Sequence, residues 1–266
     1  MTGMAEGEVV FYDCSERVAS ITLNRPAKLN AFNDNMVTQL GNCFLRFDRD
    51  ADAEVAILSG NGRAFSAGVD VEQENSLSDE ELRRLRDPMA PGTPFGDLLL
   101  RSESWKPVIA AVQGYVLGMA LGLVLKCDLI VAEAGTRFQV TETSRGLGGY
   151  RHWALLSRRG AGALGDEVCL TGRFFSAEEC QAAGILARLA KTGESLTVAR
   201  EIARQIAEHP PLSIRETVRV QRWHLARFID EVAFQTEPIR LHLTEDFREA
   251  TRAFAEKRKP TRFKGC

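Results

Sequence analysis

The chain has 266 residues and a formal net charge of −2, and 44% of its residues are hydrophobic and 26% are charged. This length can bury a full-sized core as one domain, or as one domain with an added helical part. The nearly neutral charge gives no general attraction to nucleic acids or acidic lipids and argues against functions that depend on a basic surface.

The N-terminal residues and the cysteines predict a cytoplasmic protein. Residues 1–8 lack the basic-then-apolar pattern of a signal peptide. The six cysteines contain no C-x-x-C pair, and Cys43, Cys127 and Cys169 stand in apolar runs. They are typical of small buried hydrophobic residues in a reducing compartment.

The first part of the chain predicts two strands, a helix and a third strand. Residues 9–13 and 18–23 have strand composition and flank a short turn, which predicts a hairpin. Asn33 is the predicted N-cap of a helix, and a strand is expected over residues 54–59. The apolar face of this helix is expected to contain Met36, Val37, Leu40, Phe44 and Phe47.

Residues 72–94 differ in composition from the rest of the chain. They are rich in charge up to Asp87, end in three closely spaced prolines, and contain a possible capping box at Ser78 and Glu81. Two interpretations are open, a mobile lid beside a functional site and a surface insertion without that role. A helix is expected to follow over residues 96–105.

The most apolar stretch covers residues 107–132, with glycines at positions 114, 118 and 122. It is long enough for a membrane span, and glycines four apart suit packed transmembrane helices. A globular interpretation explains more, because charged residues bracket the stretch and globular patterning continues on both sides. It predicts strands over 108–112 and 129–132, a turn at Gln113-Gly114, and a buried helix starting near Gly118.

In the globular interpretation, backbone N–H groups at two turns are the expected binding groups of the site. A helix that begins at Gly118 directs its unpaired N–H groups and its positive dipole end towards the preceding turn, where an oxyanion can bind. A second turn, over residues 64–70, follows the strand at 54–59. Two N–H groups from these turns are expected to bind one developing negative oxygen.

The rest of the chain is predicted to be mainly helical. A short strand over 138–140 and a polar loop over 141–149, which contains Glu142, precede helices around 152–158 and 162–170. Further helices are expected to begin at Ser176, Ser213 and Thr244, each a candidate N-cap. The basic tail over 257–264 is expected to be a solvated terminus or an anion contact.

Four stretches resemble, in order and at similar separations, the crotonase (enoyl-CoA hydratase/isomerase) superfamily. They are residues 23–26 (LNRP) with 30–32 (NAF), 64–70 (AFSAGVD), 106–118 (KPVIAAVQGYVLG) and 127–132 (CDLIVA). The resemblance covers essentially the whole chain and implies an α/β fold, a crotonase-like spiral of β-β-α units with a helical C-terminal region. It implies a core with the CoA and oxyanion site over 1–195 and a helical trimerisation region over 196–266.

The resemblance also implies an enzyme that acts on acyl-CoA thioesters as a homotrimer or hexamer. It implies no metal or redox cofactor, and no nucleic-acid or membrane partner. By matching motif, the oxyanion-hole N–H groups belong to Val69 and Met119. The residues expected along the CoA are Lys28, Leu29, Ala67 and Asp70.

Two departures from the family pattern bear on the chemistry. Family hydratases carry glycine after the second oxyanion glycine and a catalytic glutamate three residues later, and here Met119 and Gly122 stand in those places. The Met119 side chain must therefore turn out of the substrate pocket or narrow it. The second family glutamate matches Glu142.

Hydration of a double bond is helped by two carboxyl groups that act on the same water molecule. Shifting a double bond needs only one base, which removes a proton and returns it at another carbon. We therefore expect a Δ3-Δ2 enoyl-CoA isomerase-type proton shift with Glu142 as the single acid/base. The alternatives are an enoyl-CoA hydratase with one glutamate missing and a non-catalytic acyl-CoA binder. His152, at the start of an expected helix, is expected to be structural, with a place near the pocket as the alternative. Arg145 and Arg151 flank the loop and are expected on the solvated surface, with contact to an acidic acyl group as the alternative.

Overall fold

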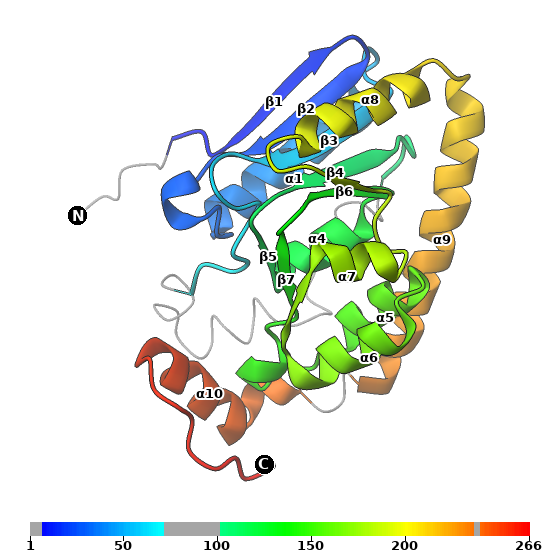
Figure 1. Ribbon diagram of the computed structural model, residues 1–266. Helices are drawn as coiled ribbons and strands as arrows, with labels where there is room; N and C mark the ends of the chain where they lie inside the picture. Colours follow the sequence, from blue (N-terminus) through cyan, green and yellow to red (C-terminus); the bar gives the residue numbers. More distant parts are fainter. Residues whose placement is uncertain (1–6, 72–101, 237–239) are drawn as a thin grey trace.

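The computed structural model describes residues 7–71, 102–236 and 240–266 (Figure 1). Its strands are β1 (Val10–Ser15), β2 (Val18–Leu23), β3 (Val55–Gly60), β4 (Val108–Val112), β5 (Tyr115–Leu117), β6 (Leu129–Glu133), β7 (Arg137–Gln139), β8 (Phe174–Ser176) and β9 (Arg188–Ala190). Its α-helices are α1 (Asp34–Arg49), α4 (Met119–Lys126), α5 (Tyr150–Arg158), α6 (Gly162–Thr171), α7 (Ala177–Ala182), α8 (Ser195–Ala207), α9 (Pro211–Thr236) and α10 (Glu245–Ala255). Short 3-10 turns are η1 (Pro26–Lys28), η2 (Thr143–Arg145) and η4 (Leu241–Leu243).

Two sheets organise the described part of the chain. The larger has the strand order β1-β2-β3-β4-β6-β9, in which β1 and β2 form the predicted antiparallel hairpin and the other pairs are parallel. The smaller has the order β5-β7-β8. The chain thus repeats one unit, because β4-β5-α4 and β6-β7-α5 each place a strand in the large sheet, a strand in the small sheet and then a helix.

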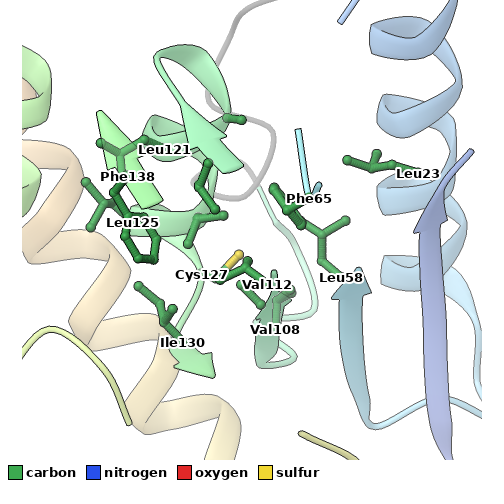
Figure 2. Packing of buried hydrophobic residues seen from close by; sticks show 14 of the residues in the cluster. Leu23, Leu58, Phe65, Val108, Val112, Leu121, Leu125, Cys127, Ile130 and Phe138 are labelled. Carbon is green, nitrogen blue, oxygen red and sulfur yellow. The ribbon is translucent and has the colours of Figure 1, made fainter. Parts of the chain in front are cut away.

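Both faces of the large sheet are covered, as expected for parallel strands with nearly continuous apolar sequence. Side chains alternate along β3: Val55 and Ile57 pack in a cluster with α8, whereas Ala56 and Leu58 join the main core. Figure 1 shows α8 lying across the strands of this sheet. Figure 2 shows the main core, where side chains of the sheet meet those of α4 and β7.

The apolar stretch over 107–132 forms three consecutive elements and the strand β6, so its interpretation as a membrane span is wrong. Within the described ranges, no helix combines the length and apolarity needed to cross a membrane. The predicted turn at Gln113-Gly114 is present, and Gly114 has φ +63°. A Cβ there would lie 2.0 Å from the Arg63 carbonyl oxygen, so only glycine fits. The short strand β5 after this turn was not predicted.

Three of the predicted helix starts are confirmed by hydrogen bonds to the capping side chain. The side chain of Asn33 accepts from the Met36 N–H at 2.9 Å, and that of Thr244 accepts from the Phe247 N–H at 3.1 Å. Ser176 and Glu179 form the reciprocal capping box. The cap predicted at Ser213 is wrong, because α9 already begins at Pro211, whose ring suits the first helical turn.

The expected helix over 96–105 is not formed in its described part, residues 102–105. This segment is instead bent around the Asp48 carboxylate, which accepts from the hydroxyls of Ser102 and Ser104 and from the Glu103 N–H. Strands β8 and β9 were not predicted. The lid expected over 72–94, with its capping box at Ser78, lies outside the described residues.

The C-terminal helices contact the core directly. Besides α8 on the sheet, the Arg222 side chain of α9 reaches Asp128, which precedes β6. α9 also exposes the large apolar side chains of Leu212, Val220, Trp223 and Phe234. A division between 195 and 196 and the assembly into a trimer or hexamer stay predictions.

Candidate functional site

The two turns singled out in the sequence lie side by side. Ser66 and Val116 form a parallel bridge, in which the Ser66 N–H donates to the Tyr115 oxygen at 3.0 Å and the Leu117 N–H donates to the Ser66 oxygen at 3.2 Å. A Cβ on Gly68 would lie 2.7 Å from the Leu117 oxygen and 3.8 Å from the Met119 nitrogen, so the two turns are in close backbone contact.

Within the part of the chain that the structure describes, the amides of Val69 and Met119 have no hydrogen-bond acceptor. Phe32 bonds to the neighbours of Val69, because its N–H donates to Gly68 and its oxygen accepts from Asp70. The Val69 N–H therefore faces away from Phe32. Met119 is the first residue of α4, where N–H groups have no partner in the helix. Among the described residues, neither N–H donates to a protein acceptor.

A buried polar cluster fixes the first turn. The Asn30 side chain accepts from the Arg25 N–H at 2.8 Å and donates to the oxygens of Asn61 and Ala64, both at 2.9 Å. The Ser66 hydroxyl donates to the Asn30 oxygen at 2.7 Å and accepts from the Gly68 N–H at 3.1 Å. Sequence reasoning missed these roles, although small polar residues inside apolar motifs were a usable signal.

The residues expected along the CoA are only partly brought together. The Ala67 N–H donates to the Leu29 oxygen at 2.9 Å, which joins their two segments, and Lys28 beside them is exposed. The Asp70 side chain is 11% exposed, and its carboxylate accepts from Arg25 Nη1 at 3.0 Å. Its side chain is thus turned towards Arg25, and the CoA role of all four residues stays a prediction.

Glu142 lies beside the peptide unit that supplies the Met119 N–H. Its side chain is 20% exposed and follows β7, immediately before η2. A Cβ on Gly118 would lie 3.3 Å from Glu142 Oε1 and 2.4 Å from Thr141 Oγ1. Gly118, with φ +49°, is therefore needed both for its backbone conformation and for the space that Thr141 and Glu142 occupy.

His152 is part of the site, contrary to its expected role in the scaffold alone. It belongs to α5, which packs on α4, and its side chain is buried. Its Nδ1 lies 3.7 Å from Glu142 Oε2, and its Nε2 lies 2.9 Å from the Gly118 oxygen. The absence of a side chain at Gly122 makes room for it, because a Cβ there would lie 3.3 Å from His152 Nε2.

The other polar groups have partners within the protein. Arg145 is half-buried and its guanidinium stacks on the exposed Phe254 ring, so it lies only partly on the solvated surface where it was expected. Burial lowers the pKa of Arg145, and the charge of Glu142 opposes this effect. In the basic tail, Arg258 pairs with Glu249 at 2.6 Å. Across the described ranges, no three metal-binding side chains form a group.

Comparisons with known proteins agree with this arrangement. The family profile described as enoyl-CoA hydratase/isomerase matches residues 13–265. The chain is 32% identical to the 2,3-dehydroadipyl-CoA hydratase of Escherichia coli K12 over an alignment 262 residues long, which covers 94% of this chain and 96% of that protein. It is 31% identical to the (E)-benzylidenesuccinyl-CoA hydratase of Thauera aromatica over an alignment 267 residues long, which covers 97% of this chain and 99% of that protein.

A solved structure with the same fold is the enoyl-CoA hydratase/isomerase of Pseudoalteromonas atlantica T6c. It has a TM-score of 0.78 and 27% identity, and the match covers 96% of this chain and all of the other. The predicted fold class is thereby confirmed. The ordered motifs, the repeated β-β-α units and these matches show that the chain belongs to the enoyl-CoA hydratase/isomerase family, the crotonase superfamily.

Proposed function

We propose that the protein shifts the double bond of a 3-enoyl-CoA into conjugation with the thioester, with Glu142 as the acid/base. The observation that supports this most is the position of the Glu142 carboxylate beside the Gly118–Met119 peptide, with no second carboxylate at position 122. One carboxylate next to an oxyanion site suffices for a proton shift.

In the proposed reaction, the thioester oxygen accepts hydrogen bonds from the N–H groups of Val69 and Met119. Glu142 removes a proton from C2, the C2–H electron pair enters the conjugated system, and negative charge collects on the thioester oxygen. The same carboxyl then returns the proton to C4, which leaves the 2-enoyl-CoA. Backbone donors are worth most as charge develops, since they are already oriented. The chemistry is proton transfer within the substrate, so we propose no metal or redox cofactor.

Hydration of 2-enoyl-CoA is the second candidate, and the names of the relatives favour it. Those compared above are hydratases. In that case Glu142 and His152 would have to orient the water that two carboxylates orient elsewhere in the family. A third possibility is binding of acyl-CoA without turnover.

The candidates are separated by supplying 3-enoyl-CoA and 2-enoyl-CoA in separate assays and following the absorbance of the conjugated thioester. We expect the absorbance to rise with 3-enoyl-CoA much faster than it falls with 2-enoyl-CoA. Faster loss of absorbance from 2-enoyl-CoA would favour the hydratase. No change with either substrate across chain lengths, together with measurable acyl-CoA binding, would favour the binder.

Replacing Gly118 with alanine is expected to reduce turnover by about 10²–10³-fold, the usual cost of one lost oxyanion donor. The added Cβ would meet Thr141 Oγ1 at 2.4 Å, so the peptide that ends in the Met119 N–H must move. Steady-state kinetics check this, with Gly135→Ala as the control, because Gly135 also has positive φ but no atom within 4 Å of its Cβ position. Equal kinetics for the two variants would contradict the expectation.

A further inference from the structure

The hydrogen bond at His152 Nε2 determines which ring nitrogen holds the proton. Nε2 lies 2.9 Å from the Gly118 oxygen. A carbonyl oxygen only accepts, so Nε2 must carry a proton, and in the neutral imidazole it is the one protonated nitrogen. The other nitrogen, Nδ1, then carries a lone pair.

The Nδ1 lone pair has no hydrogen-bond donor within the described residues. The His152 side chain is 92% buried, and Nδ1 is a buried atom without a hydrogen-bond partner. The polar group that it faces is the Glu142 carboxylate, with Oε2 at 3.7 Å. A buried acceptor that faces another acceptor is unfavourable unless a proton comes between them.

We propose that Glu142 and His152 act as a pair in which Nδ1 accepts the hydrogen bond of the Glu142 carboxyl once Glu142 has taken the substrate proton. The proposal rests on the proposed function, since it says where the substrate proton is held while the enolate exists. The C2–H bond breaks, the proton moves to Glu142 Oε2, and the O–H then donates to Nδ1. Return of the proton to carbon restores the starting pair, so no other reactant is needed.

The same ring links the acid/base to the oxyanion site. Its Nε2–H donates to the carbonyl of Gly118, and the amide of that peptide unit is the Met119 N–H. A hydrogen bond to the carbonyl polarises the peptide and strengthens its N–H as a donor, because chains of hydrogen bonds reinforce one another. His152 therefore acts as a positioning residue on both the base and one oxyanion donor.

The neighbouring titratable groups do not compete with Glu142 and His152 for the substrate proton. Among the described residues, two other titratable groups feel the charge of Glu142, namely Arg145 of η2 and Cys169 of α6. Arg145 stacks on the Phe254 ring. Burial, with the nearby Glu142 charge, raises the pKa of the Cys169 thiol to about 12, so it stays protonated.

Two substitutions test separately the two hydrogen bonds of the His152 ring, the one to the Gly118 oxygen and the proposed one with Glu142. His152→Gln keeps an N–H that can reach the Gly118 oxygen but removes the basic nitrogen, whereas His152→Asn keeps a polar group near Glu142 and loses the bond to Gly118. His209→Gln is the matched control, at an exposed position just after the end of α8. With 3-enoyl-CoA, we expect each of the two His152 variants to lose about tenfold or more in kcat with KM changed by less than about threefold. Wild-type kcat in His152→Gln, with or without a loss in His152→Asn, would overturn the pairing with Glu142.

Two further measurements test the pairing in other ways. One does not depend on 3-enoyl-CoA as the substrate, and the other uses the wild-type protein, so that misfolding of a variant cannot affect it. Exchange of the C2 protons of butyryl-CoA in deuterium oxide needs only the base and the oxyanion donors, and we expect the same loss in His152→Gln even if 3-enoyl-CoA is not the substrate. In the wild-type protein, nitrogen NMR of the four histidines should show a neutral His152 protonated on Nε2. Unchanged exchange in His152→Gln, or a proton on Nδ1 in the free enzyme, would overturn the proposal.

Discussion

Glu142→Gln is expected to lower kcat for the proton shift by about 10²–10⁴-fold, the usual contribution of general acid–base catalysis. The amide has nearly the same shape as the carboxylate but cannot take a proton from carbon. Its neighbours Thr141, Gly118 and His152 should keep their positions, and acyl-CoA binding should change little. Initial rates with 3-enoyl-CoA and calorimetric binding of a saturated acyl-CoA check the two halves of this prediction.

The matched control is Glu216→Gln, which makes the same chemical change at an exposed position of α9. It should retain the kinetics of the wild type. Activity that survives Glu142→Gln intact would remove Glu142 from the mechanism and, with it, the proposed role of His152. Loss of acyl-CoA binding in the same variant would instead indicate that the carboxylate supports the binding site.

Arg222→Met is expected to destabilise the fold by about 3–5 kcal/mol, because it leaves a buried charge without its partner. The Arg222 side chain is 2% exposed and donates to Asp128 Oδ1 at 3.1 Å and to the Lys106 oxygen at 3.0 Å. Asp128 also accepts from the Val108 N–H at 2.7 Å, at the start of β4. This cluster therefore joins α9 to the strands that lead into the site.

Thermal unfolding followed by circular dichroism measures this effect, with Arg219→Met as the control. Arg219 is exposed one turn earlier on α9, and surface substitutions of this kind usually change stability by within about 0.5 kcal/mol. We expect a clear fall in Tm for Arg222→Met only. Equal Tm values would mean that α9 is not held to the core through Asp128, and would support an independent C-terminal region.

Local features of the fold were predictable from the sequence. The caps at Asn33 and Thr244 act within a single turn of helix, and the turn at Gly114 depends on the backbone of one residue. Of the strands of three residues, β7 was predicted, but β5, β8 and β9 were missed because so short a segment has no readable periodicity. Their pairing partners lie elsewhere in the chain.

The candidate site was predicted in part. The two turns and Glu142 follow from the family motifs, and the structure places the Gly68 and Gly118 turns in contact with each other and Glu142 beside Gly118. The sequence shows that position 122 lacks the family glutamate, but it does not show that the side chain of His152 occupies the space beside Gly122. Nothing in the sequence near His152 indicates that its ring fills the space beside Gly122.

The sequence by itself determined the family, the backbone turns and the acid/base candidate, because glycine conformation, helix caps and ordered motifs act over a few residues. Only the tertiary structure decided which side chains meet: His152 with Glu142, Asp70 with Arg25, and Arg222 with Asp128. These contacts join residues from different elements, and they depend on how the helices pack on the sheet and on one another. That packing is a property of the whole core, so no short segment of the sequence reports it.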